Sequence, residues 1–304
     1  KSSTNISTAF KMYLTHINSR GMINLLKDSY VFMEEYMIIE CLDKKYEKIV
    51  EDYIGDKYYK CIYLYLDLKK YGFSNSNIKT WIQVKENEEI STVILMYYTG
   101  MHVFSIKHDY DIQELCEFIK EKRPAMICGE KIIISNIYDN LGISDYNVEL
   151  GWVRELDSII ASDRDGIEKA KEEDFYQIAK LLYEDEDLGS SYRLEELKNQ
   201  MYERNKEKYV RNYIIKNENE IICHAGTGAE NEKVAMLSYV ITNPKYRNKG
   251  YAKKICNAVC EDLIKEKKKV YLINYSTEST VLYDKLGFKI CSEWGKIFLN
   301  LKSN

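Results

Sequence analysis

The chain has 304 residues, of which 45% are hydrophobic, so it can form one or two domains with substantial cores. Its formal net charge of −4 argues against nucleic acid as a partner, because such proteins need a basic face. No apolar run reaches the about 18 residues of a membrane span, and none near the start resembles a secretory signal. We therefore expect no membrane partner and a cytoplasmic location.

Residues 1–36 are expected to form an N-terminal extension. Ser7 is a candidate cap for a helix that ends near Ser19, and a second helical stretch is predicted at Ile23–Tyr36. The extension is thus either an added helical hairpin or a leader without fixed structure.

Residues 37–155 are predicted to form a first domain that mixes strands and helices. The predicted strands are Ile38–Cys41, Lys79–Val84, Ile90–Tyr98, His102–Ser105 and Ile132–Ile134, and the predicted helices are Tyr46–Ile54, Tyr59–Lys69 and Ile112–Glu121. Gly100 and Gly129 are isolated, and no glycine-containing phosphate loop follows any of these strands. A cofactor loop is therefore not expected in this domain.

Leu156–Asp165 is predicted to be a linker strand and turn, and a second domain is expected at residues 165–304. Its predicted elements are the strand Ile167–Ala170, the helices Glu173–Tyr183 and Tyr192–Tyr202, the hairpin Val210–Ile215 with Ile221–Ala225, and the strand Val234–Ile241. The last of these strands is nearly all apolar, as a central strand covered on both faces should be.

The sequence YRNKGYA at Tyr246–Ala252 connects this strand to an amphipathic helix. Apolar residues recur there at helical spacing, at Ala252, Ile255, Cys256, Val259, Cys260, Leu263 and Ile264. A helix N-terminus directs several N–H groups and the positive end of its dipole at one point, which favours an anion. Gly250 allows a tight backbone, and Arg247 and Lys249 add positive charge. The pattern predicts a phosphate-binding loop.

Arg247-x-x-Gly250-x-Ala252 after a strand resembles the coenzyme A pyrophosphate loop of the GNAT superfamily of acyl-CoA-dependent N-acyltransferases. A second motif, LYDKLGF at Leu282–Phe288, resembles the terminal helix of that family and its exit into the last strands, and it follows the short strand Val270–Ile273. The resemblance covers residues 234–299, with weaker correspondence back to Gly166.

The resemblance implies an α/β (α+β) GNAT fold, with a mixed, mostly antiparallel central sheet flanked by helices. Residues 165–304 are then the catalytic acetyltransferase domain. The similar order of elements in residues 37–155 predicts a degenerate GNAT-like domain without the cofactor loop, so that the chain holds two such domains in tandem.

Site residues follow from the resemblance, position by position. The diphosphate contacts are expected from Arg247, Asn248, Lys249, Gly250, Tyr251 and Ala252. Backbone groups of Val240 and Ile241 are expected to bind the pantetheine arm and the acetyl carbonyl, and Asn274 to touch the pantetheine or the cofactor backbone. Many relatives have glycine in place of Asn248, but asparagine tolerates left-handed backbone angles.

Tyr283, within LYDKLGF, is the candidate general acid that the resemblance implies. A phenol with a pKa near 10 keeps its proton at neutral pH and can pass it to a leaving thiolate. The alternative is a tyrosine that only packs on the sheet. Ser276 and Ser279, which follow Asn274, are candidates either for capping the last helix or for contacting the cofactor.

A general base is harder to name. His224, on the strand Ile221–Ala225, is a candidate base, and a structural histidine is the alternative. Glu230 and Glu232 are expected to be solvated at a hairpin tip. The acidic run at residues 184–187 borders the acceptor pocket in the family, so it either attracts a cationic amine or is a solvated loop.

The cysteines predict no metal site. They are Cys41, Cys61, Cys116, Cys128, Cys223, Cys256, Cys260 and Cys291, with no C-x-x-C and no zinc-finger spacing. Cys256 and Cys260 lie one helical turn apart and are expected to be core residues. Free buried thiols suit a reducing compartment.

The resemblance implies an N-acetyltransferase that moves an acetyl group from acetyl-CoA, as co-substrate, to a primary amine by direct attack, without a metal. The acceptor is a small-molecule or peptide amine. The alternative is a non-catalytic acyl-CoA-binding or sensing module whose N-terminal region is a partner surface. A different acyl group and a homodimer both stay open.

Overall fold

The computed structural model describes residues 36–73, 75, 78–143, 146–159, 163–185, 193–206 and 210–299. The helices predicted before Tyr36 lie outside the described residues. No helix within these ranges has the length and apolar content that crossing a bilayer would require.

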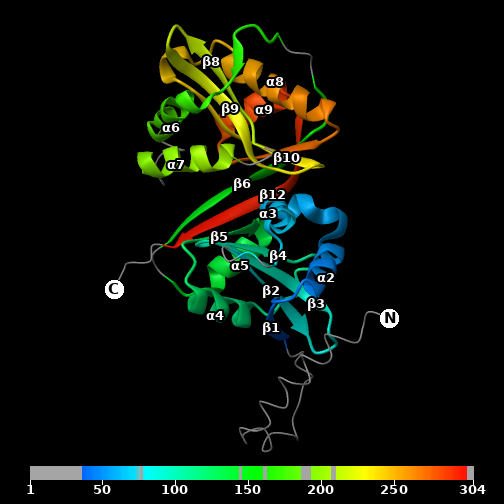
Figure 1. Ribbon diagram of the computed structural model, residues 1–304. Coiled ribbons are helices and arrows are strands. Elements are labelled where there is room, and N and C mark those ends of the chain that lie inside the picture. Colours follow the sequence, from blue (N-terminus) through cyan, green and yellow to red (C-terminus); the bar gives the residue numbers. More distant parts are fainter. Residues whose placement is uncertain are drawn as a thin grey trace, which may run out of the picture.

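The described strands form one continuous sheet that runs through both lobes of the molecule (Figure 1). Those of the first half are β1 (Tyr36–Glu40), β2 (Ile78–Lys85), β3 (Ile90–Tyr97), β4 (Gly100–Phe104), β5 (Met126–Glu130) and β6 (Tyr146–Leu156). Those of the second half are β7 (Ile167–Lys169), β8 (Asn212–Asn217), β9 (Glu220–Glu230), β10 (Val234–Thr242), β11 (Lys269–Asn274) and β12 (Phe288–Leu299).

The sheet order is β1-β2-β3-β4-β5-β12-β6-β11-β10-β9-β8-β7. Within it β4 pairs with β5, and β10 with β11, in parallel, and the other neighbours pair antiparallel. The predicted fold class, a mixed and mostly antiparallel sheet flanked by helices, is therefore confirmed.

The helices repeat in the same order in the two halves. They are α2 (Lys45–Ile54), α3 (Ile62–Tyr71), α4 (Ile112–Lys122) and α5 (Lys131–Asn140) in the first half, and α6 (Phe175–Tyr183), α7 (Leu194–Asn205), α8 (Tyr251–Lys265) and α9 (Thr277–Lys285) in the second. Short 3₁₀ segments lie at Gly55–Cys61, Glu172–Asp174 and Pro244–Tyr246. Strand, two helices, three strands, helix, strand, helix, strand thus occurs twice.

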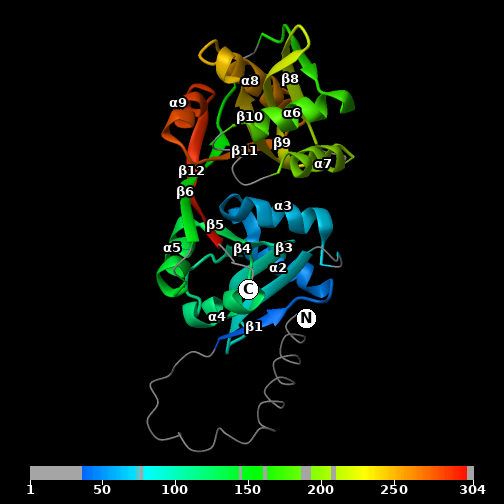
Figure 2. The same cartoon turned by 90° about the vertical axis from the view of Figure 1, so that its left-hand side faces the viewer.

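The final strands of the two halves are exchanged. β12 lies between β5 and β6, and β6 lies between β12 and β11, so each half is completed by the last strand of the other (Figures 1 and 2). β6 and β12 pair along their whole lengths, from Phe288 opposite Leu156 to Leu299 opposite Tyr146. The proposed boundaries at 37–155 and 165–304 stay a prediction, and no single cut in the chain separates the two parts of the sheet.

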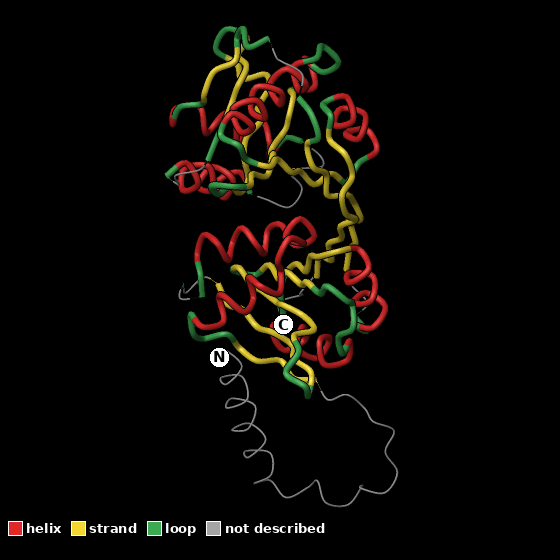
Figure 3. Tube along the Cα trace, turned by 90° about the vertical axis from the view of Figure 1, so that its right-hand side faces the viewer, coloured by secondary structure: helices red, strands yellow, loops and turns green. Residues whose placement is uncertain are grey.

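Helices cover both faces of each half, and the core fills the layers between (Figure 3). In the second half α8 packs on one face and α6 with α7 on the other. A further apolar cluster joins the halves, with Ile62 and Leu66 of α3 against Val234, Tyr271 and Trp294. The two lobes are therefore packed together rather than linked only by chain.

Two expectations about the first half are wrong. Ile132–Ile134 is part of α5, not a strand, because Ile133, Ile134 and Ile137 form one buried helical face, and a short β-branched run is ambiguous in sequence. The whole of β6 was missed, since the linker strand was expected to begin at Leu156. Gly151 interrupts its pattern, and a Cβ there would lie 2.4 Å from the carbonyl oxygen of Asn274, so close strand packing requires the glycine.

Candidate active site

The two parallel strands of the second half diverge after a short paired stretch. Val234–Met236 pairs with Lys269–Tyr271, and beyond these residues no hydrogen bond joins the described parts of β10 and β11. β10 also bulges, because Ser238 lies opposite Gly226 and Ile241 opposite His224, which leaves two residues of β10 facing one of β9. A wedge therefore opens between the strands, with backbone N–H and C=O groups of β10 along its side.

His224 contacts the backbone of the bulge. Its Nδ1 lies 2.8 Å from the carbonyl oxygen of Tyr239, a bulge residue with φ of +56°, and its Nε2 lies 3.1 Å from Asn212 Oδ1. The side chain is fully buried, and desolvation lowers its pKa to about 3. A neutral, enclosed imidazole cannot reach an acceptor amine, so the structural alternative for His224 is the one that the geometry supports.

The predicted phosphate loop directly follows the diverging end of β10. Asn248 and Gly250 have φ of +63° and +82°, so both positions use the left-handed region that asparagine and glycine tolerate. Gly250 is the N-cap of α8 and supplies no side-chain cap, so the N–H groups of the first turn are left for another acceptor. The loop residues 247–250 are exposed. These features suit an anion at the positive end of the helix dipole.

Arg247 is held by two contacts in this loop. Its Nε donates to the carbonyl oxygen of Thr242 at 3.1 Å, and its Nη2 donates to Asp185 Oδ2 at 2.9 Å. Asp185 is the second residue of the acidic run at 184–187, and its side chain is mostly buried. Part of the acidic run thus pairs with the cation of the loop. The sequence could not indicate this contact, because the two residues lie far apart in the chain. Residues 186 and 187 lie outside the described ranges.

Tyr283 lies on α9 and packs on the same core cluster as Val240 and Tyr251. Its ring meets Phe288 edge-on with centroids 6.0 Å apart, and among the described residues its hydroxyl has no hydrogen-bond partner. Burial raises the pKa of Tyr283, so the phenol keeps its proton well above neutral pH. The structure therefore gathers the bulged strand, the start of α8 and the candidate acid around one core.

Asn274 is buried, and its side chain is used within the protein. Its Oδ1 accepts from Arg154 Nε at 2.8 Å, and its Nδ2 donates to the carbonyl oxygen of Ser276 at 3.1 Å and to Thr280 Oγ1 at 3.0 Å. Ser276 caps α9 by accepting from Ser279 N. The side chain of Asn274 thus anchors the beginning of α9, and Ser276 has the capping role.

Arg154 was missed by sequence reasoning, because it lies on β6 and so comes from the first half. It is 2% exposed, and its Nη1 donates to Asp284 Oδ1 at 2.6 Å, next to Tyr283. No sequence signal links residue 154 to residues 274 and 284, since only the strand exchange brings them together. Arg154 therefore fixes the helix that carries the candidate acid.

Glu230 is not solvated, so that expectation is wrong. Its carboxylate is buried between Arg211 Nη2 at 2.8 Å and Lys268 Nζ at 2.5 Å. Two cations from distant positions compensate the buried charge, which the local sequence at the hairpin tip could not indicate. Glu232, by contrast, is exposed.

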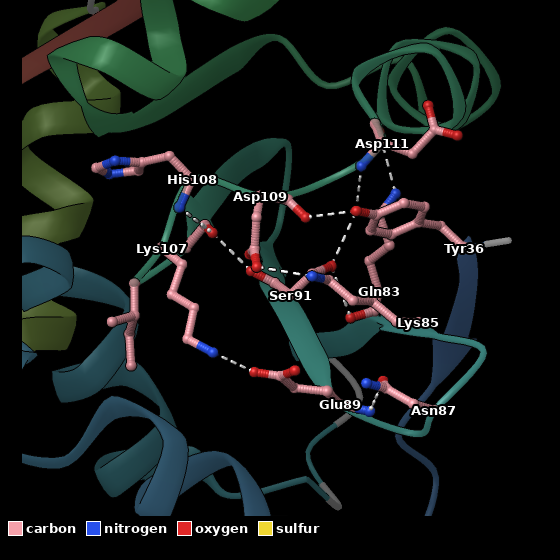
Figure 4. A network of polar contacts seen from close by, with 12 residues as sticks. Tyr36, Gln83, Lys85, Asn87, Glu89, Ser91, Lys107, His108, Asp109 and Asp111 are labelled. Atoms are coloured by element: carbon pink, nitrogen blue, oxygen red, sulfur yellow. Dashed lines mark hydrogen bonds and ion pairs between the residues drawn. The ribbon is translucent and has the colours of Figure 1, made fainter. Parts of the chain in front are cut away.

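The matching region of the first half is closed. Asp111 caps α4 with its own carboxylate, which accepts from the N–H groups of Gln113 at 2.8 Å and Glu114 at 3.0 Å (Figure 4). His108 Nε2 lies 3.2 Å from Glu130 Oε2 and thereby connects the loop after β4 to the end of β5. A carboxylate thus occupies the helix N-terminus that stays open in the second half.

Comparisons with known proteins agree with this architecture. Residues 172–288 match the model of the acetyltransferase (GNAT) family. A tandem GNAT protein from the clavulanic acid biosynthesis pathway is 10% identical, with 86% of this chain and 98% of that chain covered and a TM-score of 0.56. A GCN5-related N-acetyltransferase from Sphaerobacter thermophilus is 12% identical over 86% of this chain and 94% of that chain, with a TM-score of 0.58.

A Drosophila protein is 11% identical and has a TM-score of 0.62, with 88% of this chain and 100% of that chain covered. None of the curated protein sequences matches the chain significantly. Identities this low show the fold alone. The match to the family model is what relates residues 172–288 to acetyltransferases. Residues 172–288 therefore form a domain of the GNAT acetyltransferase family, within a chain that has the tandem GNAT fold.

The donor set in the described residues consists of backbone N–H groups, cations and a phenol. It contains no group of three or more histidine, cysteine or acidic side chains placed to hold a metal. This set suits a phosphorylated acyl carrier, since N–H groups and guanidinium bind phosphate oxygens.

Proposed function

We propose that the protein is an N-acetyltransferase that moves an acetyl group from acetyl-CoA to a primary amine by direct attack. The observation that carries the proposal is the contrast between the halves. Among the residues that the structure describes, only the second half combines diverging parallel strands, a bulge and an uncapped helix behind a cationic loop. The proposal extends to a cytoplasmic location, which the eight free cysteines support, since thiols persist in a reducing compartment.

Each part of the site has a task in this reaction. The loop at residues 247–252 binds the diphosphate, and backbone groups of Val240 and Ile241 orient the thioester beside the wedge. The amine attacks the carbonyl carbon, the C–N bond forms and the C–S bond breaks. N–H groups at the bulge stabilise the developing oxyanion, Tyr283 gives its proton to the leaving sulfur, and the amine releases a proton to water.

Titration of acetyl-CoA into the purified chain by calorimetry tests the cofactor site. We expect binding that is lost in the double variant Arg247→Ala/Gly250→Glu, because the substituted carboxylate repels the diphosphate and the guanidinium is gone. Arg193→Ala, an exposed arginine at the start of α7, is the matched control and should bind as the parent does. No binding by the parent chain would refute the proposal.

Tyr283→Phe tests the assigned acid. Removal of the hydroxyl should lower kcat by about 100-fold or more, the range of general acid catalysis, while acetyl-CoA binding stays unchanged. Tyr176→Phe, at an exposed tyrosine of α6, is the control. Transfer at the parent rate by Tyr283→Phe would show that another group or water protonates the sulfur.

A non-catalytic acyl-CoA sensor is the second candidate. The observation that favours it is the closed first half, which in a sensor is the surface that contacts a partner. The two candidates differ in turnover, because a sensor binds acetyl-CoA but releases no coenzyme A with any amine. Thiol release that depends on both an amine and Tyr283 would exclude the sensor.

A further inference from the structure

A cavity of about 490 Å³ lies between the two halves of the protein. α3 and the turn after β3 bound it on one side, and α7 and the end of β9 bound it on the other. Figure 2 shows α3 and α7 facing each other across the boundary between the lobes. A space of this size suits a small molecule, and neither half could form it alone.

The cavity adjoins the strand at which the wedge begins. Its floor, Gly228–Glu230, belongs to β9, and a Cβ on Gly228 would lie 2.6 Å from Ser238 Oγ and 3.6 Å from the ring of Tyr239. Ser238 and Tyr239 lie two and three residues beyond Met236, the last residue of β10 that pairs with β11. A molecule in the cavity is therefore one strand away from the place proposed for the thioester.

The charges around the cavity are balanced. Asp67 and Glu203 are acidic, and Lys70 and Arg204 are basic. Glu230 adds no net charge, since Arg211 and Lys268 compensate it from outside the cavity. A polycation or a polyanion would find no complementary excess here, whereas a ligand with one group of each sign would.

Tyrosines form the wall on the side of the first half. Tyr71 and Tyr97 stack with ring centroids 5.2 Å apart, and Tyr98 meets Tyr97 edge-on at 4.7 Å. The hydroxyls of Tyr71 and Tyr97 lie 3.0 Å apart and share a hydrogen bond. The aromatic faces therefore provide contact area for the apolar part of a small ligand.

Arg204 is a cavity-lining cation that contacts the bulge of β10. Its Nη1 donates to the hydroxyl of Tyr239, and its guanidinium lies 5.3 Å from the centroid of that ring. Within the described part of the chain its Nε and Nη2 have no hydrogen-bond partner. An arginine fixed at one nitrogen, with two N–H donors remaining, is suited to a carboxylate.

We infer that this cavity is the acceptor site and that it binds a small zwitterionic amine of the amino-acid type, whose carboxylate contacts Arg204. The inference rests on the proposed function for its chemistry. The carboxylate on Arg204 places the neighbouring amine toward Ser238 and the wedge, where the C–N bond would form.

The test compares L-amino acids with their carboxamides, which keep the amine but lack the carboxylate. The release of coenzyme A is measured at saturating acetyl-CoA. Spermidine and glucosamine complete the panel. We expect at least one amino acid to be acetylated, with its amide at least about tenfold poorer in kcat/KM. Arg204→Gln should lower kcat/KM for the amino acid by about 10- to 100-fold, the value of a charge-assisted hydrogen bond, and leave the amide nearly unchanged.

Two variants separate recognition from structure. Arg193→Gln, on the same helix but outside the cavity, should leave the preference for the carboxylate intact. Tyr239→Phe removes the hydroxyl that holds Arg204 but keeps the guanidinium, so the preference should persist. Equal or better use of amides or spermidine, or an unchanged preference in Arg204→Gln, would overturn the inference.

The same panel, measured as thermal stabilisation without acetyl-CoA, keeps the two proposals apart. Stabilisation by an amino acid that Arg204→Gln abolishes supports the cavity even if acetyl-CoA does not bind. If acetyl-CoA binds but no amino acid binds or is acetylated, the proposed cofactor site is supported and the proposal of a zwitterionic acceptor is refuted.

Discussion

Gly250 shows, at the residue scale, why the loop requires glycine. A Cβ at this position would meet nothing within 4 Å, so steric room is not the constraint. The constraint is the backbone, which has φ of +82° and which an L-residue with a side chain adopts at a cost of about 1 kcal/mol. Sequence reasoning named this glycine correctly as one whose backbone angles matter.

Gly250→Ala should therefore weaken acetyl-CoA binding and lower the free energy of unfolding by about 1 kcal/mol. Gly142 provides the matched control, since it has φ of +67° and equally open surroundings but lies between α5 and β6. Gly142→Ala should lose similar stability and bind acetyl-CoA normally. Equal loss of binding in both variants, by calorimetry, would mean that the effect is one of general stability.

Asp262 predicts how the fold responds to acid. Its carboxylate accepts from Arg164 Nη1 at 2.7 Å and Nη2 at 2.9 Å, and from the hydroxyl of Tyr213, so that its pKa falls to about 2, chiefly because of Arg164. A lowered pKa stabilises the folded state above the unfolded pKa of about 4, and this stabilisation is lost as the pH falls toward 2.

Chemical denaturation of the parent and of Asp262→Asn between pH 2 and pH 6 measures this contribution. We expect a difference of at most about 2 kcal/mol at pH 6, reduced by solvent screening of the half-exposed Arg164, that shrinks as the pH drops from 4 to 2. A difference that does not change with pH would assign the effect to packing rather than to charge.

At the scale of the element, α9 is positioned by a strand from the other half. Arg154 on β6 contacts Asn274 before the helix and Asp284 near its end. Arg154→Met should cost about 1–3 kcal/mol of stability, because it leaves a buried carbonyl oxygen without a donor. It should also lower kcat, since Tyr283 lies on the same helix, with acetyl-CoA binding less affected.

Lys131→Met is the control for this prediction, because Lys131 lies on α5 of the first half and pairs with Glu293 of the exchanged strand β12 at 2.8 Å. It should leave kcat unchanged. If Arg154→Met loses stability but turns over like the parent, the arginine supports the fold without positioning the acid.

At the scale of the whole molecule, the exchanged strands make the halves depend on each other. β12 is the partner of β5 on one side and of β6 on the other. A chain that stops after Asp157 lacks β11 and β12, so β6 loses both of its partners and β5 loses one. We therefore expect it to be insoluble or unfolded. Co-expression with the fragment 158–304 should restore a soluble complex. A folded, monomeric first half would contradict this prediction.

The asymmetry of the halves predicts one acetyl-CoA per chain. Asp111 occupies the start of α4, and His108 with Glu130 bridges the ends of β4 and β5. A bound diphosphate would have to displace a carboxylate, which the second half does not require. Calorimetry should give a stoichiometry of one for the parent chain and none for Arg247→Ala/Gly250→Glu, whereas two sites in the parent would mean that the first half opens.

The sequence by itself determined the family resemblance and the fold, and it predicted a cofactor loop, because these depend on local signals. Helical spacing behind a strand, a glycine at the turn and the motif around Tyr283 are contiguous in the chain, and the structure places them around one core. The alternation of strands and helices was also sufficient to predict that the first half has a similar order of elements.

Only the tertiary structure decided how the halves combine. Arg154 with Asn274, Asp185 with Arg247, and Glu230 with Lys268 are pairs far apart in sequence, and no periodicity connects them. The exchange of β6 and β12 follows from strand pairing, whose partners are chosen by long-range packing rather than by local propensity. The cavity between α3 and α7 is lined by residues of both halves, so only the tertiary structure could reveal it.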